Sequence, residues 1–585
     1  MKAHSFISLN FVNFVYMTKQ WQLVPKFNPE LSDQLPEFHP VVLQLLFNRG
    51  LVERGAIDKF LHPDYESENF DPFLFKRMAE VVDLIIKHIK AQDKIVVYGD
   101  YDADGVTSTA VLIETLKIFK AQVDFYIPDR VKEGYSLNEP AIRQIVEAGA
   151  KLIITVDCGI ISQKEVALAQ SLGATVIVTD HHQPPEEDEE LPPALIINPH
   201  MRDETYPFKY LAGVGVAFKL AQALILKSTL TEEDKKKLEL KLLDLVAVGT
   251  VADLVSLSGE NRVLVKKGLE IINHNGRLGL QELIKVSQLN NGKLIDSWNI
   301  GFQIAPRLNA AGRMDIAHKA FDLLVTKDKV EAEALANFLN EKNLERQKVT
   351  EEIMAEAERE IGELDEKIII SVCPNGSENW NEGVVGLAAG RLCEKYHRPT
   401  LVITRTEDGY KGSGRSISEF DVISAVRECG EFLERFGGHP ASCGFSFKAE
   451  NLENFARKMR QIAKDKLSDN DLLPKVKVEA EADLKTIDEE LVVELEKFSP
   501  FGQENWKPKI MSRNLPIADI MTMGISNQHI KLRFYGFWAI SFGGAEEWRD
   551  FKIGDRVDLV YNLEMNDFNG RREVQLKIID MKPAV

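Results

Sequence analysis

The sequence has few cysteines, and none of them are paired at a C-x-x-C spacing. The five, Cys158, Cys373, Cys393, Cys429 and Cys443, are scattered over 585 residues. This pattern excludes a disulfide-rich scaffold and a cysteine-ligated zinc site, and it fits a reducing cytoplasm. No apolar run approaches the roughly 18–20 residues that span a bilayer, so no membrane partner is expected.

The N-terminus and the net charge exclude further classes of protein. The apolar start lacks a clustered basic region and an A-x-A-like cleavage site, so a signal peptide is not expected, and either Met1 or Met17 can be the start. A net charge of −18 argues against a protein that coats nucleic acid with its whole surface, although a basic groove stays open. The motifs G-K-[ST] and G-x-G-x-x-G are missing after the first strand, which disfavours P-loop and Rossmann nucleotide binding.

From about residue 78 to residue 200, short β-branched runs alternate with segments of helical periodicity. Such alternation with short connections predicts an α/β fold, a parallel sheet with helices on both faces. The expected strands are 94–100, 123–129, 151–157, 174–180 and 194–199, and the expected helices are 105–119, 138–150 and 162–173.

The remaining chain divides into further regions by composition and periodicity. A second α/β pattern begins near residue 367, and about five glycine-separated strands after a polar linker predict a small β-barrel. The predicted regions are 1–77, an N-terminal helical cap; 78–316, the first α/β domain; 317–364, a connecting helical region; 365–467, the second α/β domain; and 476–585, the barrel.

Ionisable residues follow three of the strands in the first α/β domain. The first strand ends in Asp100, Asp102 and Asp104, the third in Asp157, and the fourth in Asp180 and the pair 181–182, both histidines. The carboxyl ends of parallel strands meet at one edge of a sheet, so these groups are expected to converge there. Asp253, just after an apolar helix, is a further candidate.

Lys and Arg are absent from 95–110, 152–163 and 174–183, so nothing local offsets this negative charge. Carboxylates crowded together raise one another's pKa values, and a pair of divalent ions would relieve the repulsion. Carboxylate with some imidazole and no thiolate suits Mn²⁺ or Mg²⁺ better than zinc.

Each of these residues also has an ordinary structural interpretation. A single Asp at a strand end is commonly a turn or cap residue, and Asp104 could cap a helix that starts at Gly105. A lone His pair is more often on the surface. The joint pattern on successive strands favours the metal site over these alternatives. Cys158, next to Asp157, is expected to point away into the packing.

At these positions the chain resembles the DHH phosphoesterase family. The motifs are DYDADG (100–105), TVDCG (155–159), TDHH (179–182) and GTVADL (249–254). Downstream, APRLNAAGR (305–313), SGRS (413–416) and GGHPASCGF (437–445) are similar to motifs of the branch that degrades single-stranded DNA. The resemblance implies a DHH catalytic domain at 78–316, a DHH-associated substrate-binding domain at 365–467 and an OB-fold at 476–585.

The resemblance also implies a ligand set. One metal would be bound by Asp104, Asp157, His181 and Asp253, and the other by Asp102 and the bridging Asp157. Asp100 and His182 would bind a metal directly or support a ligand. Many relatives have a histidine where this chain has Tyr98, so the second metal is expected to have fewer protein ligands. The implied catalytic residues are Asp100, Asp102, Asp104, Asp157, His181, His182 and Asp253.

Further polar residues suit phosphate binding. Arginine forks match phosphate geometry, and glycine-rich turns let backbone N–H groups approach an anion. Taken alone, each arginine is more often part of a surface salt bridge, and half or more of the barrel aromatics are expected in the core. The implied substrate-binding residues are Arg307, Asn309, Arg313, Ser413, Arg415, Ser416 and His439.

The resemblance implies a metal-dependent 5′→3′ exonuclease that hydrolyses single-stranded DNA to 5′-mononucleotides with two ions of Mn²⁺ or Mg²⁺, in DNA repair and recombination. The alternatives are a DHH phosphodiesterase acting on short RNA, cyclic dinucleotides or polyphosphate, and a non-catalytic DNA-binding scaffold. The resemblance implies a cytoplasmic monomer, with a single-strand-binding protein and a helicase as partners.

Overall fold

The computed structural model describes residues 19–130, 132–289, 292–313, 317–361, 366–376, 378–568 and 571–584. The chain forms two compact units, and each is described by itself. Unit 1 contains the described parts of 1–52, 350–495 and 508–585, and unit 2 contains Glu53–Val349 and Glu496–Lys507.

A five-stranded sheet forms the centre of unit 2. All its strand pairs are parallel, in the order β3-β2-β4-β5-β6. The strands are β2 (Lys94–Gly99), β3 (Gln122–Tyr126), β4 (Ala150–Val156), β5 (Thr175–Thr179) and β6 (Leu195–Ile197). The sheet confirms the predicted α/β alternation, and each of the five expected strands is present.

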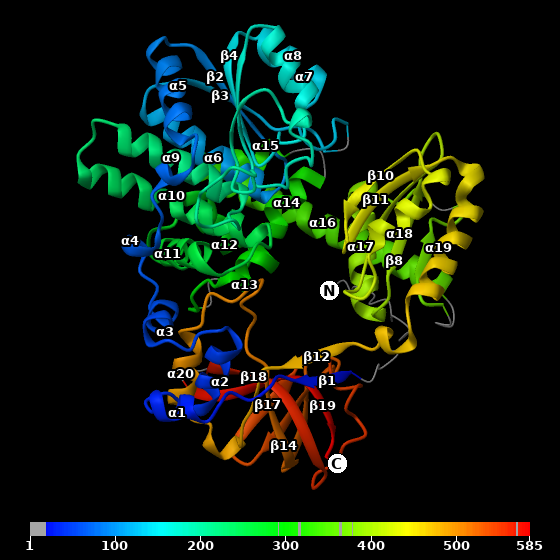
Figure 1. Cartoon of the computed structure of the whole chain (residues 1–585). Coiled ribbons are helices and arrows are strands. Elements are labelled where there is room, and N and C mark those ends of the chain that lie inside the picture. The colour runs from blue at the N-terminus through cyan, green and yellow to red at the C-terminus, as the bar shows by residue number, and fades with distance from the viewer. Residues whose placement is uncertain are drawn as a thin grey trace, which may run out of the picture. The chain divides into compact units, whose positions relative to one another are not determined.

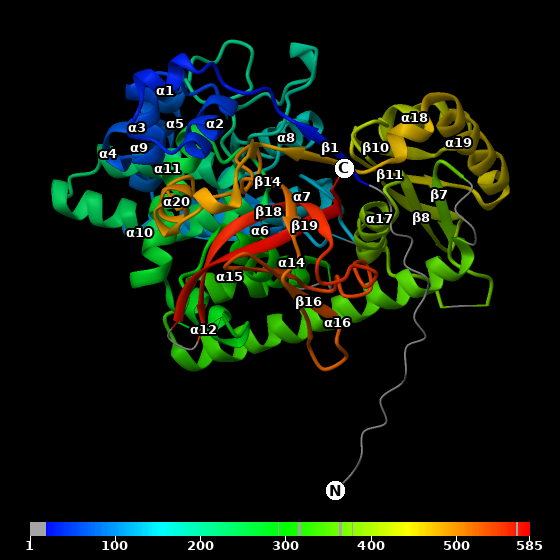
Figure 2. The same cartoon turned by 90° about the horizontal axis from the view of Figure 1, so that it is seen from below.

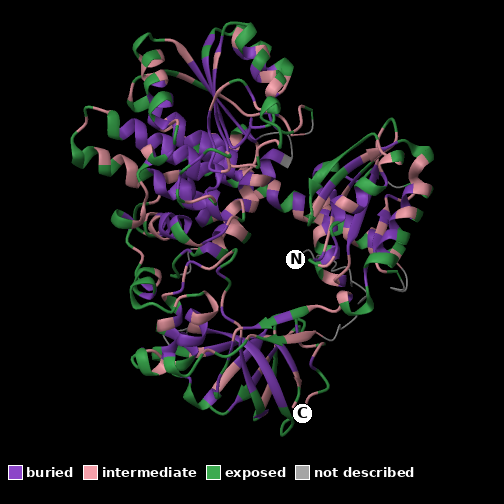
Figure 3. Cartoon of the chain, in the orientation of Figure 1, coloured by how far each residue is buried: buried purple, intermediate pink, exposed green. Residues whose placement is uncertain are grey.

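Helices cover both faces of this sheet (Figure 1). Ile95 and Val97 of β2 pack into the larger core, whereas Val96 and Tyr98 pack into a separate cluster on the opposite face. Burial on both sides explains why the strands are nearly continuous apolar runs (Figure 3). Helices of the first face are α5 (Met78–Lys90), α6 (Ala103–Ile118), α9 (Gly213–Lys227) and α10 (Glu232–Ala252), and those of the second are α7 (Glu139–Glu147) and α8 (Gln163–Ser171).

The rest of unit 2 is helical. It contains α3 (Arg54–Leu61), α4 (Tyr65–Glu68), α11 (Gly259–Asn275), α12 (Leu278–Val286), α13 (Ser297–Asn299), a π-helix (Ile300–Ile304), α14 (Ala305–Arg313), α15 (His318–Val325) and, as far as Val349, the long α16 (Lys329–Ile361; Figure 2), whose remaining residues belong to unit 1. The segment Glu496–Lys507 joins this unit because the buried Arg262 donates hydrogen bonds to the carbonyls of Phe498, at 2.7 Å, and Lys497, at 2.9 Å.

Unit 1 contains a second α/β sheet in the order β10-β11-β9-β8-β7. Only β7 and β8 run parallel, and the other neighbours are antiparallel. The strands are β7 (Ile369–Val372), β8 (Thr400–Arg405), β9 (Tyr410–Arg415), β10 (Arg435–His439) and β11 (Ser442–Phe447), with helices α17 (Glu382–Tyr396), α18 (Val422–Glu428) and α19 (Leu452–Lys466).

Unit 1 also contains a seven-stranded sheet near the C-terminus, in the order β13-β14-β18-β19-β17-β16-β15. The long strands β18 and β19 pair antiparallel over most of their length, and both are red in Figure 2. The strands are β13 (Ala480–Glu481), β14 (Ile510–Pro516), β15 (Asp519–Met523), β16 (His529–Phe534), β17 (Phe537–Ser541), β18 (Arg556–Phe568) and β19 (Arg571–Pro583), and α20 (Glu489–Glu496) follows β13 in the chain.

The first described strand of the chain pairs with this last region. β1 (Gln20–Leu23) runs parallel to β12 (Lys475–Val478), and Trp21 Nε1 donates to Asp580 Oδ2 at 2.6 Å. The helices α1 (Glu30–Gln34) and α2 (Pro40–Asn48) follow β1. The sequence predicts short helices near residues 37–65, and α2 and α3 are among them, but it gives no sign of β1.

Candidate metal centre

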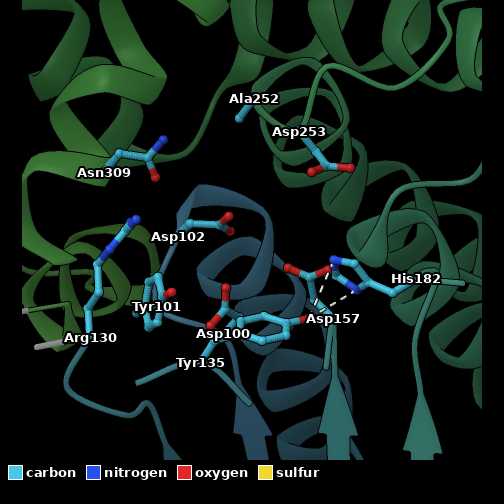
Figure 4. Close-up of a pocket in the computed structure, with 10 residues that line it drawn as sticks. All are labelled: Asp100, Tyr101, Asp102, Arg130, Tyr135, Asp157, His182, Ala252, Asp253 and Asn309. Carbon is cyan, nitrogen blue, oxygen red and sulfur yellow. Dashed lines mark hydrogen bonds between the residues drawn. The ribbon is translucent and has the colours of Figure 1, made fainter. Parts of the chain in front are cut away.

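The strand-end acids line one pocket in unit 2, with a cavity of about 340 Å³ (Figure 4). Asp100 and Asp102 follow β2, Asp157 follows β4 and Asp253 ends α10, so the convergence predicted from the sheet is present. The lining residues are Asp100, Tyr101, Asp102, Arg130, Tyr135, Asp157, His182, Ala252, Asp253 and Asn309.

The start of α6 places two of the acids. Asp102 is its N-cap, and its Oδ1 accepts from the backbone N–H of Asp104, at 2.9 Å, and of Gly105, at 3.1 Å. The alternative that Asp104 caps the helix is therefore wrong. The Asp104 carboxylate instead accepts from the N–H groups of Gly213, at 2.7 Å, and Val214, at 2.8 Å, where α9 begins. The positive end of the α9 dipole thus faces the acids.

Asp157 has a strained backbone, and its side chain is closely packed against the start of α9. Its φ is +59°, in the left-handed region that few residues other than glycine adopt. A side chain at Gly213 would put its Cβ 2.5 Å from the Asp157 side chain, so only glycine allows α9 to approach so closely. The backbone N–H of Asp157 donates to the carbonyl of Thr179 at 3.1 Å, which ties the end of β4 to β5.

His181 lies among three carboxylates. Its Nε2 is 3.1 Å from Asp157 Oδ1, 3.6 Å from Asp253 Oδ2 and 4.0 Å from Asp104 Oδ2. Three buried atoms here, His181 Nε2, Asp157 Oδ1 and Asp100 Oδ1, have no hydrogen-bond partner in the described structure. Buried polar atoms are normally satisfied, so these orphans fit a bound cation.

The spacing of donor atoms also fits metal binding. In three groups, one donor atom from each member lies within 4.8 Å of the others. The groups are Asp104 with His181 and Asp253; Asp157 with His181 and His182; and Asp100 with Asp102 and Asp157. A mainly carboxylate donor set matches Mn²⁺ or Mg²⁺. The structure brings together all seven residues that the sequence predicts, and the assignment of each as a ligand stays a prediction.

The electrostatics of the pocket oppose ionisation of the acids. Burial first, and then neighbouring carboxylates, raise the pKa values of Asp100, Asp157 and Asp253 well above the usual range, and the pKa of Asp104 to about 7. Burial lowers the pKa of His181 to about 3, which keeps its imidazole neutral. A neutral imidazole is the form that binds a metal.

Asp180 and Tyr135 also belong to the site: the sequence places Asp180 at this edge of the sheet without a role as a ligand, and it does not predict Tyr135. The fully buried Asp180 accepts from His182 Nδ1 at 2.7 Å, and Tyr135 Oη lies 3.2 Å from the same nitrogen. Burial opposes the charge on Asp180, but the hydrogen bonds from His182 and from the backbone N–H of Ile160, together with attraction to the neighbouring imidazoles, outweigh it and lower the Asp180 pKa. Asp180 is visible in the TDHH motif, whereas Tyr135 lies in a connecting segment with no local signal.

Arg130 is a pocket residue that the sequence does not predict, and Tyr98 does not reach the pocket. Arg130, which sequence reasoning missed, lines the pocket and lies over the Tyr101 ring, 5.0 Å from its centroid (Figure 4). Tyr98 faces away from the pocket, because its hydroxyl donates to the carbonyl of Ser136 at 3.1 Å and its ring stacks on Tyr126. Cys158 lies in the same packed cluster as Tyr98, as predicted.

The predicted phosphate-binding residues of α14 have different surroundings. Asn309 lines the pocket, and its Oδ1 accepts from the backbone N–H of Ala103 at 2.7 Å, which leaves the amide nitrogen for the cavity. Arg307 is held elsewhere: its Nε donates to Asn340 of α16 at 3.0 Å and its Nη1 to the carbonyl of Gln303 at 2.6 Å. The side chain of Arg313 lies outside the described part of the structure.

The remaining predicted residues lie on the sheet of unit 1. Ser413 and Arg415 are two apart on β9, and Arg415 Nη1 donates to Ser413 Oγ at 3.3 Å. Ser442 of β11 pairs with Arg415 on one side and with His439 of β10 on the other, so one strand separates these two side chains. Ser416 Oγ donates to the carbonyl of Phe420 at 2.6 Å.

The aromatic side chains of the C-terminal region are partly buried and partly exposed. Phe534 and Trp548 are buried, whereas Tyr535 and Phe542 are exposed. Trp538 is half-buried beneath two cations, with Lys531 Nζ 4.4 Å and Arg533 Cζ 5.5 Å from its ring centroid.

Comparisons with known proteins identify three parts of the chain. The DHH family N-terminal domain matches residues 94–250, the DHHA1 domain matches 365–465 and the RecJ OB domain matches 478–580. These matches confirm the predicted fold class, including the OB-fold. Among the described residues, no helix is long and apolar enough to cross a membrane.

Full-length relatives agree with these domains. The chain is 39% identical to the single-stranded-DNA-specific exonuclease RecJ of Bacillus subtilis, over 96% of this chain and 70% of that protein. It is 31% identical to the Escherichia coli protein of the same name, over 97% and 100%. The crystal structure of RecJ with Mn²⁺ from Thermus thermophilus superposes with a TM-score of 0.81 at 28% identity, over 97% of this chain and 80% of that one. A structure of the same protein with Mg²⁺ has a TM-score of 0.76 at 27% identity, over 97% and 79%. The chain therefore belongs to the RecJ family of single-stranded-DNA-specific exonucleases.

Proposed function

We propose that this chain is a metal-dependent exonuclease that hydrolyses single-stranded DNA with two ions of Mn²⁺ or Mg²⁺. The observation that carries the proposal is the pocket lined by Asp100 and Asp157, because these two residues and the adjacent His181 keep buried donor atoms without hydrogen-bond partners among the described residues. Its relatives are named as exonucleases of this specificity, and two solved relatives contain Mn²⁺ and Mg²⁺. A scaffold without catalysis would be free to lose these donors, and the chain retains them.

The expected ligands are Asp104, Asp157, His181 and Asp253 for one ion, and Asp102 with Asp157 for the other. When bound, two such ions polarise a phosphodiester, activate a water and stabilise the leaving oxygen. Asp180 holds the His182 ring by accepting from its Nδ1, and the α9 N-terminus holds the Asp104 carboxylate. Arg130 and the amide nitrogen of Asn309 are positioned to bind the non-bridging phosphate oxygens.

We further propose that degradation starts at the 5′ end and releases 5′-mononucleotides. A terminal phosphate carries more charge than an internal diester and accepts several charge-assisted hydrogen bonds. Arg415, Ser413 and His439 on the sheet of unit 1 offer suitable donors. Arg313, whose side chain lies outside the described structure, stays a predicted phosphate ligand.

The polarity is tested by incubating the protein and Mn²⁺ with single strands labelled at either end. We expect the 5′ label to appear first, in a mononucleotide, and blunt duplex to be cut little. A first product from the 3′ end would contradict the polarity. Little cutting of DNA beside rapid cutting of short RNA or cyclic dinucleotides would contradict the substrate.

End recognition is tested with Arg415→Ala. The variant should lose about 10- to 100-fold of the preference in kcat/KM for 5′-phosphorylated over 5′-hydroxyl strands, because one charge-assisted contact is removed. Lys411→Ala is the matched control, since Lys411 lies on the same strand and only pairs with Glu382 at the surface. If Arg415→Ala keeps the preference for 5′-phosphorylated strands, another residue recognises the terminal phosphate.

We also propose that the protein is a cytoplasmic monomer that acts in repair and recombination and interacts with a single-strand-binding protein and a helicase, as the resemblance implies. The domain boundaries predicted from the sequence belong to the same proposal. The choice between Met1 and Met17 falls outside the described residues.

A further inference from the structure

Unit 2 has a pair of stacked aromatic rings that are exposed to solvent. Trp298 of α13 is 52% exposed and Phe302 of the following π-helix is 68% exposed. Their ring centroids are 5.3 Å apart and their planes are inclined by 23°. Large apolar side chains usually contribute to a core, so an exposed stacked pair is an unusual use of two aromatics.

The backbone beneath the two rings is firmly held. Asp296 and Asn299 form a reciprocal capping box at the start of α13, and Ser297 Oγ donates to the carbonyl of Phe501 at 2.5 Å. Ile300 and Ile304 are buried on either side of Phe302. The rings therefore project from a fixed surface and do not belong to a loose loop.

The π-helix that carries Phe302 also connects the rings to the metal centre. π-helical turns are rare and occur frequently at functional sites. Ile300–Ile304 runs without a break into α14, which places Asn309 on the pocket wall. Asn309 follows Phe302 by seven positions in the sequence. Along a helix axis this is about 10 Å, at 1.5 Å per residue.

A second contact places the π-helix near the pocket. A Cβ at Gly301 would lie 3.6 Å from Val251 Cγ1, so the residue before Phe302 packs on α10, two residues before Asp253. Leu254, which follows Asp253, is 70% exposed and has a φ of +60°. Apolar surface is therefore present both beside Asp253 and on the π-helix that packs against the same end of α10.

We propose that Trp298 and Phe302 form a base-stacking platform for the single strand whose end occupies the metal centre. The inference rests on the proposed function. A flat aromatic pair matches the π-face that every base has, so it binds without sequence preference. The length of about 10 Å from Phe302 to Asn309 on the pocket wall is spanned by about three stacked nucleotides at about 3.4 Å each, so we expect the platform to meet the strand a few nucleotides in from its degraded end.

The test compares strands that carry one abasic residue at each position from one to eight, counted from the degraded end. The wild-type protein with Mn²⁺ should be slowed most when the abasic residue is near position three or four. Trp298→Ala combined with Phe302→Ala should raise KM for a 12-nucleotide strand by about 5- to 100-fold, because each stacked base is worth about 1–3 kcal/mol. The double variant should also lose its sensitivity to the position of the abasic residue.

A dinucleotide is too short to reach the platform, so its kcat/KM should stay unchanged in the double variant. Trp298→Phe with Phe302→Tyr should retain the wild-type behaviour, because stacking rings are kept. Leu226→Ala is the matched control, since Leu226 is an exposed apolar residue of α9 in the same unit. Unchanged KM on the long strand, or an equal loss on the dinucleotide, would overturn the platform.

Strand affinity separates this inference from the proposed function. The dissociation constant of a fluorescent 12-nucleotide strand is measured at fixed salt by anisotropy, with Ca²⁺ in place of Mn²⁺. If the wild-type protein binds the strand about 5-fold or more tightly than the double variant but never cuts it, the platform stands and the proposed function fails. If the wild-type protein cuts the strand and both bind it equally, the platform fails.

Discussion

Two groups of buried carboxylates in unit 2, at the metal centre and around Arg277, differ in that only the second has an arginine hydrogen-bonded to its acids. In the second group, Arg277 donates to Asp244 Oδ1 at 2.8 Å and to Glu114 Oε1 at 3.0 Å. Burial alone would disfavour every charge there, but mutual attraction outweighs it, raising the pKa of Arg277 and lowering that of Glu114. At the metal centre burial and repulsion act together, and the pKa values of the acids rise.

The difference separates a structural charge cluster from a binding site. Around Arg277, donors and acceptors are matched within the chain, and Nη1 also donates to the carbonyl of Leu324 at 2.7 Å. At the metal centre, buried oxygens and a nitrogen keep no partner among the described residues. We therefore expect a cation from solution to neutralise the buried acid cluster that has no cation of its own.

The largest expected effect is on hydrolysis. Asp157→Asn should lower kcat at saturating Mn²⁺ by about 1,000-fold or more, because the predicted bridging ligand is worth several kcal/mol to the transition state. Asparagine is chosen because it tolerates the left-handed backbone at this position better than alanine. Rates are measured on an end-labelled single strand.

Asp203→Asn is the control for this substitution. Asp203 is an exposed carboxylate of the same unit, paired with Lys76 and Arg77. It should leave kcat unchanged, and the metal-free midpoint of thermal unfolding should not fall in Asp157→Asn. Near-normal turnover by Asp157→Asn would contradict the bridging role.

The second effect is on stability. Arg277→Met should lower the free energy of unfolding by about 3–5 kcal/mol, because Asp244 is left buried without its cation and Glu114 loses one of its two cationic partners and keeps Lys241. Unfolding in urea followed by circular dichroism gives the change. Adding Asp244→Leu to the variant should recover much of the loss, and no loss in Arg277→Met alone would rule out the structural role.

A third effect links metal to pH. The raised pKa of Asp104, about 7 against an ordinary 3.8, means that the metal-free folded state binds protons more tightly than the unfolded state. Its stability therefore falls as the pH rises toward 7. Mn²⁺ at 100 times its dissociation constant should add about 2.7 kcal/mol at pH 8, and less at pH 6, where protons compete for the ligands.

This gain is read from unfolding midpoints with Mn²⁺ and again after a chelator. Arg277→Met should keep the gain, since its cluster is separate from the metal ligands. Stabilisation by Mn²⁺ that is equal at both pH values would argue that ion binding is not coupled to these carboxylates.

The smallest effect is expected at the surface. Lys267 and Glu270 of α11 form an exposed ion pair at 2.8 Å. Glu270→Gln should change the free energy of unfolding by less than about 1 kcal/mol, because solvent screens such pairs. A loss comparable to that of Arg277→Met would remove the distinction between buried and exposed charge in this unit.

Much of unit 2 is predictable from the sequence because its pattern is local. Continuous apolar strands such as β2 and β4 alternate with amphipathic helices, and the acids follow the strands directly. Parallel topology then brings the acids together without further information. The hydrogen bonds that orient the site are less visible: that Asp102 caps α6, and that Tyr135 meets His182, depends on contacts between segments.

Unit 1 is less predictable because several of its strands are short or polar. β14 and β15 lie in a segment broken by Pro516 and carry polar residues, and neither is expected from the sequence. Residues 529–542, a run rich in apolar and aromatic residues, form a hairpin of β16 and β17, with Tyr535 at a φ of +52° between them. β1 has no strand-like pattern beyond four residues, and its partner is far away in the chain.

The pairing of β1 with β12 has a consequence for synthesis. About 450 residues separate the two strands, so at about 5–20 residues per second a newly made β1 waits about half a minute or longer for its partner. Over that time the apolar face of α2, which is buried in the finished protein, has no final packing site. Unit 2 in turn lacks the segment bonded by Arg262 until Lys497 and Phe498 have left the ribosome. The nascent chain therefore exposes apolar surface at its beginning until nearly all of it has been made, which makes it a substrate for chaperones that hold nascent chains.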